Sequence, residues 1–62
     1  MRYHYRGPVM HFEHCISKVD YWVEAKSSKQ ALVMLSGRYK RENGFAMRSA
    51  IKLDAKYLKE SG

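Results

Sequence analysis

Residues 21–45 read YWVEAKSSKQALVMLSGRYKRENGF, and this stretch decides the fold. It opens with the end of a strand, predicted over Val19–Ala25, in which apolar odd positions face inward and Asp20, Trp22 and Glu24 face outward. A large aromatic side chain on an exposed sheet face usually marks a contact surface. Trp22 therefore contacts a ligand, or it is covered by the chain's own tail or by a dimer partner.

A helix follows this strand and carries clear signals at both ends. Ser27 and Gln30 fit a capping box, in which the serine hydroxyl accepts from an amide of the first turn and the glutamine side chain reaches back. The pattern predicts a helix from about Ser28 to Glu42, and Gly44 suits the left-handed residue that ends it. The apolar positions lie on one stripe, typical of a helix packed on a sheet: Ala31, Leu32, Leu35 and Tyr39.

The residues before this stretch predict two more strands. Tyr3 and Tyr5 alternate with basic residues, the period of a half-buried strand. Gly7-Pro8 then predicts a hairpin turn, with a bulge in an edge strand as the alternative. A second strand is predicted over Val9–Ile16, and Ser17-Lys18 is the expected reversal before the strand that contains Trp22.

The residues after the helix predict one last strand. Alternating apolar and polar residues run from Ile51 to Tyr57, and the tail is expected to fray from about Lys59. A right-handed crossover would make this strand parallel to its neighbour. The fold class is therefore α+β: a single three- to four-stranded, mainly antiparallel sheet with one helix packed on one face, in the order β-β-(β)-α-β.

Composition bounds the chain to one domain, residues 1–62, with a formal net charge of +6. This excess of positive charge favours polyanionic or acidic partners. Cys15 is the sole cysteine, so no intramolecular disulfide forms, which suits a reducing compartment. The opening MRYHYRG lacks the apolar core of a signal peptide, and no run approaches the roughly 20 apolar residues of a membrane span. We therefore expect a cytoplasmic protein without membrane contact.

The pattern argues against metal binding, catalysis and a cofactor. His11 and His14 point to opposite faces of their predicted strand, and His11 lies about 13 Å from Cys15 at strand rise. Zinc needs ligands that converge on one point. No third group orients a thiol–imidazole pair, and no glycine-rich phosphate loop is present. We expect a non-enzymatic binding protein.

Two sets of residues are candidates for binding. The sheet face away from the helix is predicted to carry Arg2, His4, Arg6, His11, Glu13, Trp22, Glu24 and Lys52. Its aromatic and basic side chains suit base stacking and phosphate neutralisation. The basic end of the helix adds Arg38, Lys40 and Arg41, with Arg48 nearby, for a nucleic-acid backbone.

RNA or DNA is thus one class of partner, and a protein is the other. Glu13 and Glu24 share the face with Trp22, and this mixed charge suits a protein interface, where Trp, Tyr and Arg are common anchors. An open sheet with free edges also suits a homodimer. The alternative function is an adaptor or inhibitor that acts on another protein.

Several short motifs carry a resemblance to a known group of proteins. They are Tyr3-x-Tyr5-x-Gly7-Pro8-Val9-x-x-Phe12, Ala25-x-Ser27, Lys29-Gln30-Ala31-Leu32 and Arg38-Tyr39-Lys40. Over nearly the whole chain they resemble small uncharacterised basic proteins of phages and conjugative elements in low-GC Gram-positive bacteria. This resemblance implies a protein of a mobile element and no particular activity.

A weaker likeness is to archaeal ribosomal protein LX. It is carried by Val23-Glu24-Ala25, Ala31-Leu32 and Arg48-x-x-Ile51-x-Leu53. Asn43-Gly44-Phe45 replaces that family's glycine-serine-basic segment after the helix. The likeness therefore implies a strand-strand-helix-strand order and transfers no RNA-binding residue.

Overall fold

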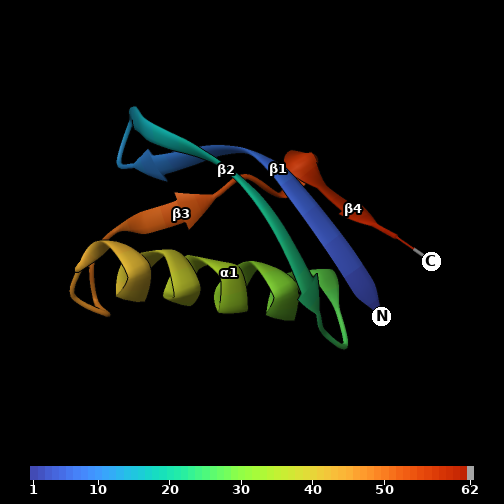
Figure 1. The fold of residues 1–62 in the computed structure, drawn as a ribbon. Coiled ribbons are helices and arrows are strands. Elements are labelled where there is room, and N and C mark those ends of the chain that lie inside the picture. Colours follow the sequence, from blue (N-terminus) through green and yellow to red (C-terminus); the bar gives the residue numbers. More distant parts are fainter. Residues whose placement is uncertain (62) are drawn as a thin grey trace.

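The sheet is organised around β1 (Arg2–His11), which pairs with every other strand in the computed structural model, where residues 1–61 are described. β2 (His14–Glu24) lies along one edge of β1. The other edge is shared by β3 (Ile51–Leu53) and β4 (Leu58–Glu60). All three pairings are antiparallel, and α1 (Ser28–Asn43) lies across one face (Figure 1). The predicted α+β class is confirmed.

β1 and β2 form one long hairpin, so the predicted turn at Gly7-Pro8 and the reversal at Ser17-Lys18 are wrong. Gly7 pairs with Val19 and Pro8 pairs with Lys18, deep inside the two strands. Residues 6–8 have no strand partner on the opposite edge of β1, because β4 pairs with residues 3–5 and β3 with residues 9–11. Because proline has no backbone N–H to donate, it destabilises a strand least where the strand has no hydrogen-bonded neighbour.

The actual reversal of the hairpin is at Phe12-Glu13, between His11 and His14. Phe12 has a φ of 56°, which is uncommon for a residue with a large side chain, and it is 73% exposed. The pairing then shifts, because Val9 faces Ser17 whereas Met10 faces Cys15. This bulge leaves Ile16 exposed, and the strand predicted over Val9–Ile16 is divided between β1 and β2 by the turn.

The helix has the boundaries and caps that the sequence predicts. The Ser27 hydroxyl accepts from the Gln30 amide at 3.2 Å, and the Gln30 side chain accepts from the Lys26 amide at 2.6 Å. At the other end Gly44 has a φ of 74° and donates its N–H to the Lys40 carbonyl. These bonds satisfy helix-end groups that would otherwise lack partners.

The core lies between α1 and the sheet. Its buried side chains are Tyr3, Tyr5, Val9, Tyr21, Ala25, Ala31, Leu35, Tyr39 and Ile51. The helix contributes the stripe that the sequence predicts, and β2 contributes the buried Tyr21, with Val19 and Val23 partly buried against the core. Figure 1 shows no element across the opposite face of the sheet within residues 1–61.

The last predicted strand is interrupted. β3 ends at Leu53, and the Asp54 side chain then accepts from the Lys56 amide at 3.0 Å, which starts a short 3-10 helix, η1 (Ala55–Tyr57). The chain resumes as β4, so Lys59 is paired in the sheet and does not begin a frayed tail. Gly62, part of that predicted tail, lies outside the described residues.

The prediction that the last strand is parallel to its neighbour in the sheet is also wrong. α1 carries the chain from β2 over β1 to the far edge, so β3 lies two strands from β2 and joins β1 instead. β3 runs in the same direction as β2. Because β1 runs opposite to β2, β3 is antiparallel to β1, its neighbour in the sheet.

The break between β3 and β4 faces the Gly7-Pro8 segment of β1. The fully buried Tyr5 donates its hydroxyl to the Pro8 carbonyl at 2.6 Å and accepts from the Asp54 amide at 2.9 Å. Burial raises the pKa of this hydroxyl above its usual 10.0. The ring of Tyr57 lies so close that a Cβ on Gly7 would be 2.6 Å from its Cγ.

Replacement of Gly7 by alanine should therefore destabilise the protein. The new methyl group would overlap Cβ and Cγ of Tyr57, which are near the backbone and cannot swing aside, so η1 must shift. We expect Gly7→Ala to lower the free energy of unfolding by about 1–3 kcal/mol, measured by urea denaturation. The double variant Gly7→Ala/Tyr57→Ala should lose less than the sum of the two single changes; simple additivity would refute the contact.

Candidate functional site

The uncovered sheet face centres on Trp22, which is 48% exposed. Trp22 pairs across the hairpin with His4, and the two rings stack with centroids 4.1 Å apart and planes 10° from parallel. The guanidinium of Arg2 lies 5.1 Å from the indole centroid. A hollow beside Trp22 is lined by Arg2, Val23 and Glu24. Three residues predicted for the site thus form one aromatic and cationic cluster.

The imidazole of His4 is held in place by Asp20. Nε2 of His4 contacts Oδ1 of Asp20, and since an ionised carboxylate only accepts, the imidazole is the donor. Asp20 is the neighbour of Trp22 on the outward row of β2 and pairs with Arg6. The acid therefore fixes the stacked pair and offsets part of the local positive charge.

Basic residues outnumber acidic ones on this face. Register places five cations there, Arg2, Arg6, Lys18, Lys52 and Lys59, against Asp20 and Glu24. Since Asp20 is occupied by His4, the surface has a positive character that suits an anionic ligand.

Two residues predicted for this face lie elsewhere. His11 pairs with the buried Ile51, and its ring lies 6.4 Å from that of Phe45, on the helix side of the sheet. Glu13 is in the hairpin turn. Both errors follow from the misplaced turns. The sequence predicts a separate strand that starts at Val9, whereas Val9 and His11 continue the alternation of β1 and Glu13 lies outside both strands.

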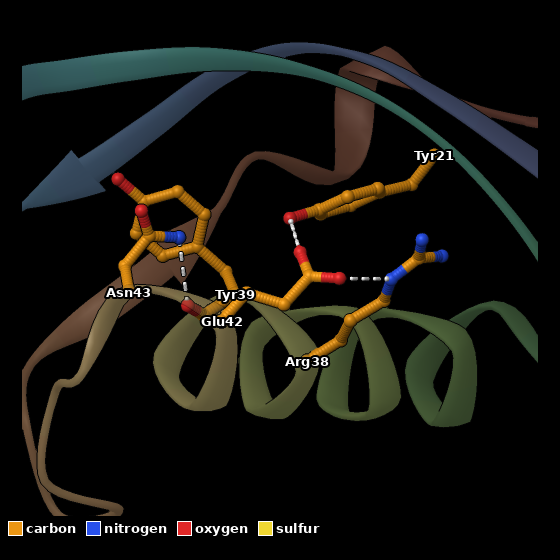
Figure 2. Close-up of polar contacts among 5 residues, drawn as sticks. All are labelled: Tyr21, Arg38, Tyr39, Glu42 and Asn43. Atoms are coloured by element: carbon orange, nitrogen blue, oxygen red, sulfur yellow. Dashed lines mark hydrogen bonds and ion pairs between the residues drawn. The ribbon is translucent and has the colours of Figure 1, made fainter.

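The basic helix end is partly occupied by a structural cluster (Figure 2). Glu42 accepts from the Tyr21 hydroxyl at 3.0 Å and from Nε of Arg38 at 3.2 Å. The Arg38 guanidinium also lies 4.5 Å from the centroid of the Tyr21 ring. Asn43 closes the same end of α1 by donating to the Tyr39 carbonyl at 3.0 Å. Arg38 therefore ties α1 to β2.

This cluster shifts two pKa values. Burial, and next the hydrogen bond to Glu42, raise the pKa of Tyr21 above 10.0. The hydrogen bonds from Tyr21 and Arg38 lower the pKa of Glu42 below 4.5. Both shifts favour the pair of a neutral tyrosine and an ionised carboxylate in the folded protein.

The other predicted cations of the helix end do not form one cluster with the sheet face. Lys40 donates its ammonium to the Met47 carbonyl at 2.9 Å and so fixes the loop after α1. Arg41 lines a groove with Val33, Met34 and Met47, all exposed on α1 or the following loop. Arg48 is exposed in the turn beyond. The predicted site residues are thus divided between the open sheet face and the helix side.

Sequence reasoning missed three residues that the open face brings together: Lys18, Tyr57 and Lys59. Lys18 was expected in a turn, Tyr57 in the inward row of a strand and Lys59 in a frayed tail. A signal existed for Lys18, because it lies in the alternating segment SKVDYWV, whereas the short segment LKE around Lys59 shows no alternation. No sequence signal places Tyr57, whose position depends on η1.

Metal and membrane features are not seen in the described part of the chain. Among residues 1–61, no three His, Cys, Asp or Glu side chains gather in a way that could hold a metal ion. Neither helix there has the length and apolar character needed to cross a membrane.

Comparisons with known proteins give no relative from which a site could be transferred. No family model matches the chain, and neither the curated proteins nor the solved structures contain a match. The candidate site therefore stands on its own geometry.

The Glu42 cluster predicts a specific acid sensitivity. A carboxylate whose pKa is lowered by folding stabilises the protein above the pKa of the unfolded chain, near 4.5, and this stabilisation is lost as the pH falls through the folded value. Glu42→Gln should therefore reduce the loss of stability as the pH falls below about 4.5, measured by urea denaturation. Glu13→Gln is the matched control, because Glu13 forms no ion pair with the described residues. Equal acid sensitivity of wild type and Glu42→Gln would contradict the assignment.

Proposed function

We propose that this protein binds single-stranded nucleic acid on its open sheet face and has no catalytic role. The observation that carries the proposal is the exposed Trp22, stacked on His4 and flanked by Arg2 on an uncovered sheet. Unpaired bases stack on such aromatic platforms, and basic neighbours neutralise the phosphates. An unpaired strand is favoured because duplex bases have no free ring face.

The open face supports this function better than the helix end does. Arg38 is held by Glu42 and by the Tyr21 ring, and Lys40 is held by the Met47 carbonyl. A cation that already has an acidic partner gains less from a phosphate. On the sheet face, Arg2, Arg6 and Lys59 form no ion pair with the described residues. We therefore assign the main contact to the sheet.

The setting that we propose is the cytoplasm, with the chain acting as a small protein of a mobile element. The support is the single cysteine, which is exposed and free, and the motif resemblance to phage and conjugative-element proteins.

A protein partner is the second candidate, favoured by one observation on the other side of the molecule. Val33, Met34 and Met47 are exposed around one groove whose charged rim is Arg38 and Arg41. Exposed apolar residues with a basic rim suit an acidic protein surface. Such a partner would make the protein an adaptor or inhibitor.

The test of the nucleic-acid proposal is titration with short single-stranded DNA and RNA at two salt concentrations. We expect wild-type affinity to fall steeply as salt rises, because phosphate contacts release counterions. Trp22→Ala should weaken binding by about 1–3 kcal/mol, the usual value for one stacked base, whereas Trp22→Phe should keep most of it. Fluorescence anisotropy measures the affinity, and circular dichroism checks the fold.

The controls separate the two surfaces. Arg2→Gln, beside Trp22 on the open face, should reduce the salt dependence, whereas Arg41→Gln, on the helix side, should leave it unchanged. Unaltered binding by folded Trp22→Ala would refute the open-face site. A folded wild-type protein that binds no oligonucleotide would leave the protein partner as the better proposal.

A further inference from the structure

Two adjoining hollows lie beside the Trp22 cluster and share Arg6 and Tyr57. The larger, of about 740 Å³, follows the Gly7-Pro8 segment of β1 and also includes Lys18. The smaller, of about 390 Å³, is lined by His4, Lys56 and Lys59 in addition to the shared residues. The Lys56 ammonium pairs with Asp54 at 3.7 Å and lies 5.5 Å from the centroid of the Tyr57 ring. His4 belongs to the Trp22 stack, so the hollows continue the candidate site along β1.

The charges around these hollows suit a phosphate. Arg6 lies between them, with Lys18 on the side of β2 and Lys59 on the side of β4. None of these three cations forms an ion pair with a residue that the structure describes. The acid in the larger hollow, Asp20, is bound to His4. Arg6 can donate two parallel hydrogen bonds to one phosphate group.

Tyr57 supplies a second aromatic surface on the far side of Arg6. Tyr57 is 38% exposed, and its ring rests on the backbone of Gly7, where a Cβ would be 2.6 Å from its Cγ. Its inner edge meets the ring of Tyr5 at 6.4 Å between centroids. At about 3.3 Å per residue, Gly7 lies about 10 Å along β1 from His4, the level of the Trp22 stack. Because Gly7 has no side chain, the Tyr57 ring can lie against its backbone; a larger residue at position 7 would displace the ring.

We propose that this surface binds one dinucleotide step of a single strand. One base stacks on Trp22, the connecting phosphate is held at Arg6, with Lys18 and Lys59 on either side, and the next base stacks on Tyr57. This inference rests on the proposed function and deepens it, because it assigns the ligand's repeating unit to named positions. The two bases lie on separate rings, so the ligand must be unpaired and unstacked at this step.

The experiment uses oligothymidylate as the probe and the fluorescence of Trp22, the single tryptophan, as the readout. Stacking of a base on Trp22 quenches this signal, so quenching at saturation reports the first stack while the titration midpoint reports total affinity. We expect Tyr57→Ala to weaken affinity at least about fivefold, the low end for one stacked base, with unchanged quenching at saturation. Tyr57→Phe keeps the ring face and should bind like wild type.

The phosphate position has its own variant and control. Arg6→Gln should lower the slope of log affinity against log salt by about one phosphate contact, whereas Lys29→Gln, on α1, should not. Circular dichroism and urea denaturation confirm that each variant is folded.

The outcomes distinguish this inference from the proposed function. Wild-type affinity and salt slope in both Tyr57→Ala and Arg6→Gln, with loss of binding in Trp22→Ala as measured by fluorescence anisotropy of labelled oligothymidylate, would overturn the dinucleotide step and leave the function intact. An oligothymidylate that fails to quench Trp22, or binds Trp22→Ala normally, would overturn both. Loss of affinity in Tyr57→Phe equal to that in Tyr57→Ala would also overturn the inference, because stacking would not be the cause.

Discussion

The structure depends on the buried hydroxyl of Tyr5. It donates to the Pro8 carbonyl and accepts from the Asp54 amide, and so joins the middle of β1 to the point where β3 ends. Both backbone groups lie where the sheet ladder is interrupted, and an unpaired polar group in such a place costs free energy. A side chain from β1 thus replaces ladder hydrogen bonds that a glycine-proline segment does not make.

This joint accounts for the division of the sheet edge into two short strands. β3 and β4 pair with opposite ends of β1, and η1 occupies the interval between them. The interval brings Tyr57 onto Gly7 and places Lys59 beside His4. On the other side of the sheet, Tyr21, Glu42 and Arg38 fix α1 to β2. One face is therefore closed by the helix, and the other keeps its aromatic and basic residues exposed.

The sequence predicts those features that depend on local chemistry. The caps at Ser27 and Gly44, the inward stripe of α1 and the outward Trp22 follow from hydrogen-bonding capacity and periodicity. The strand boundaries fail because Gly7-Pro8 has the composition of a turn, while the real turn at Phe12-Glu13 has no turn signature. The sequence correctly places Arg2, His4, Arg6 and Trp22 on the open face. The position of Tyr57 depends on its contact with Gly7, fifty residues earlier in the chain, and no local sequence pattern reveals such a contact.

The most direct test of this account is the free energy of unfolding of Tyr5→Phe compared with Tyr3→Phe. Both tyrosines are buried in β1, but the Tyr3 hydroxyl forms no hydrogen bond with the described residues. We predict that Tyr5→Phe loses about 1–3 kcal/mol, because Pro8 and Asp54 lose a shared partner, and that the Asp54 amide exchanges faster with solvent. Tyr3→Phe should remain close to wild type. Equal stability of the two variants, with unchanged exchange at Asp54, would contradict the account.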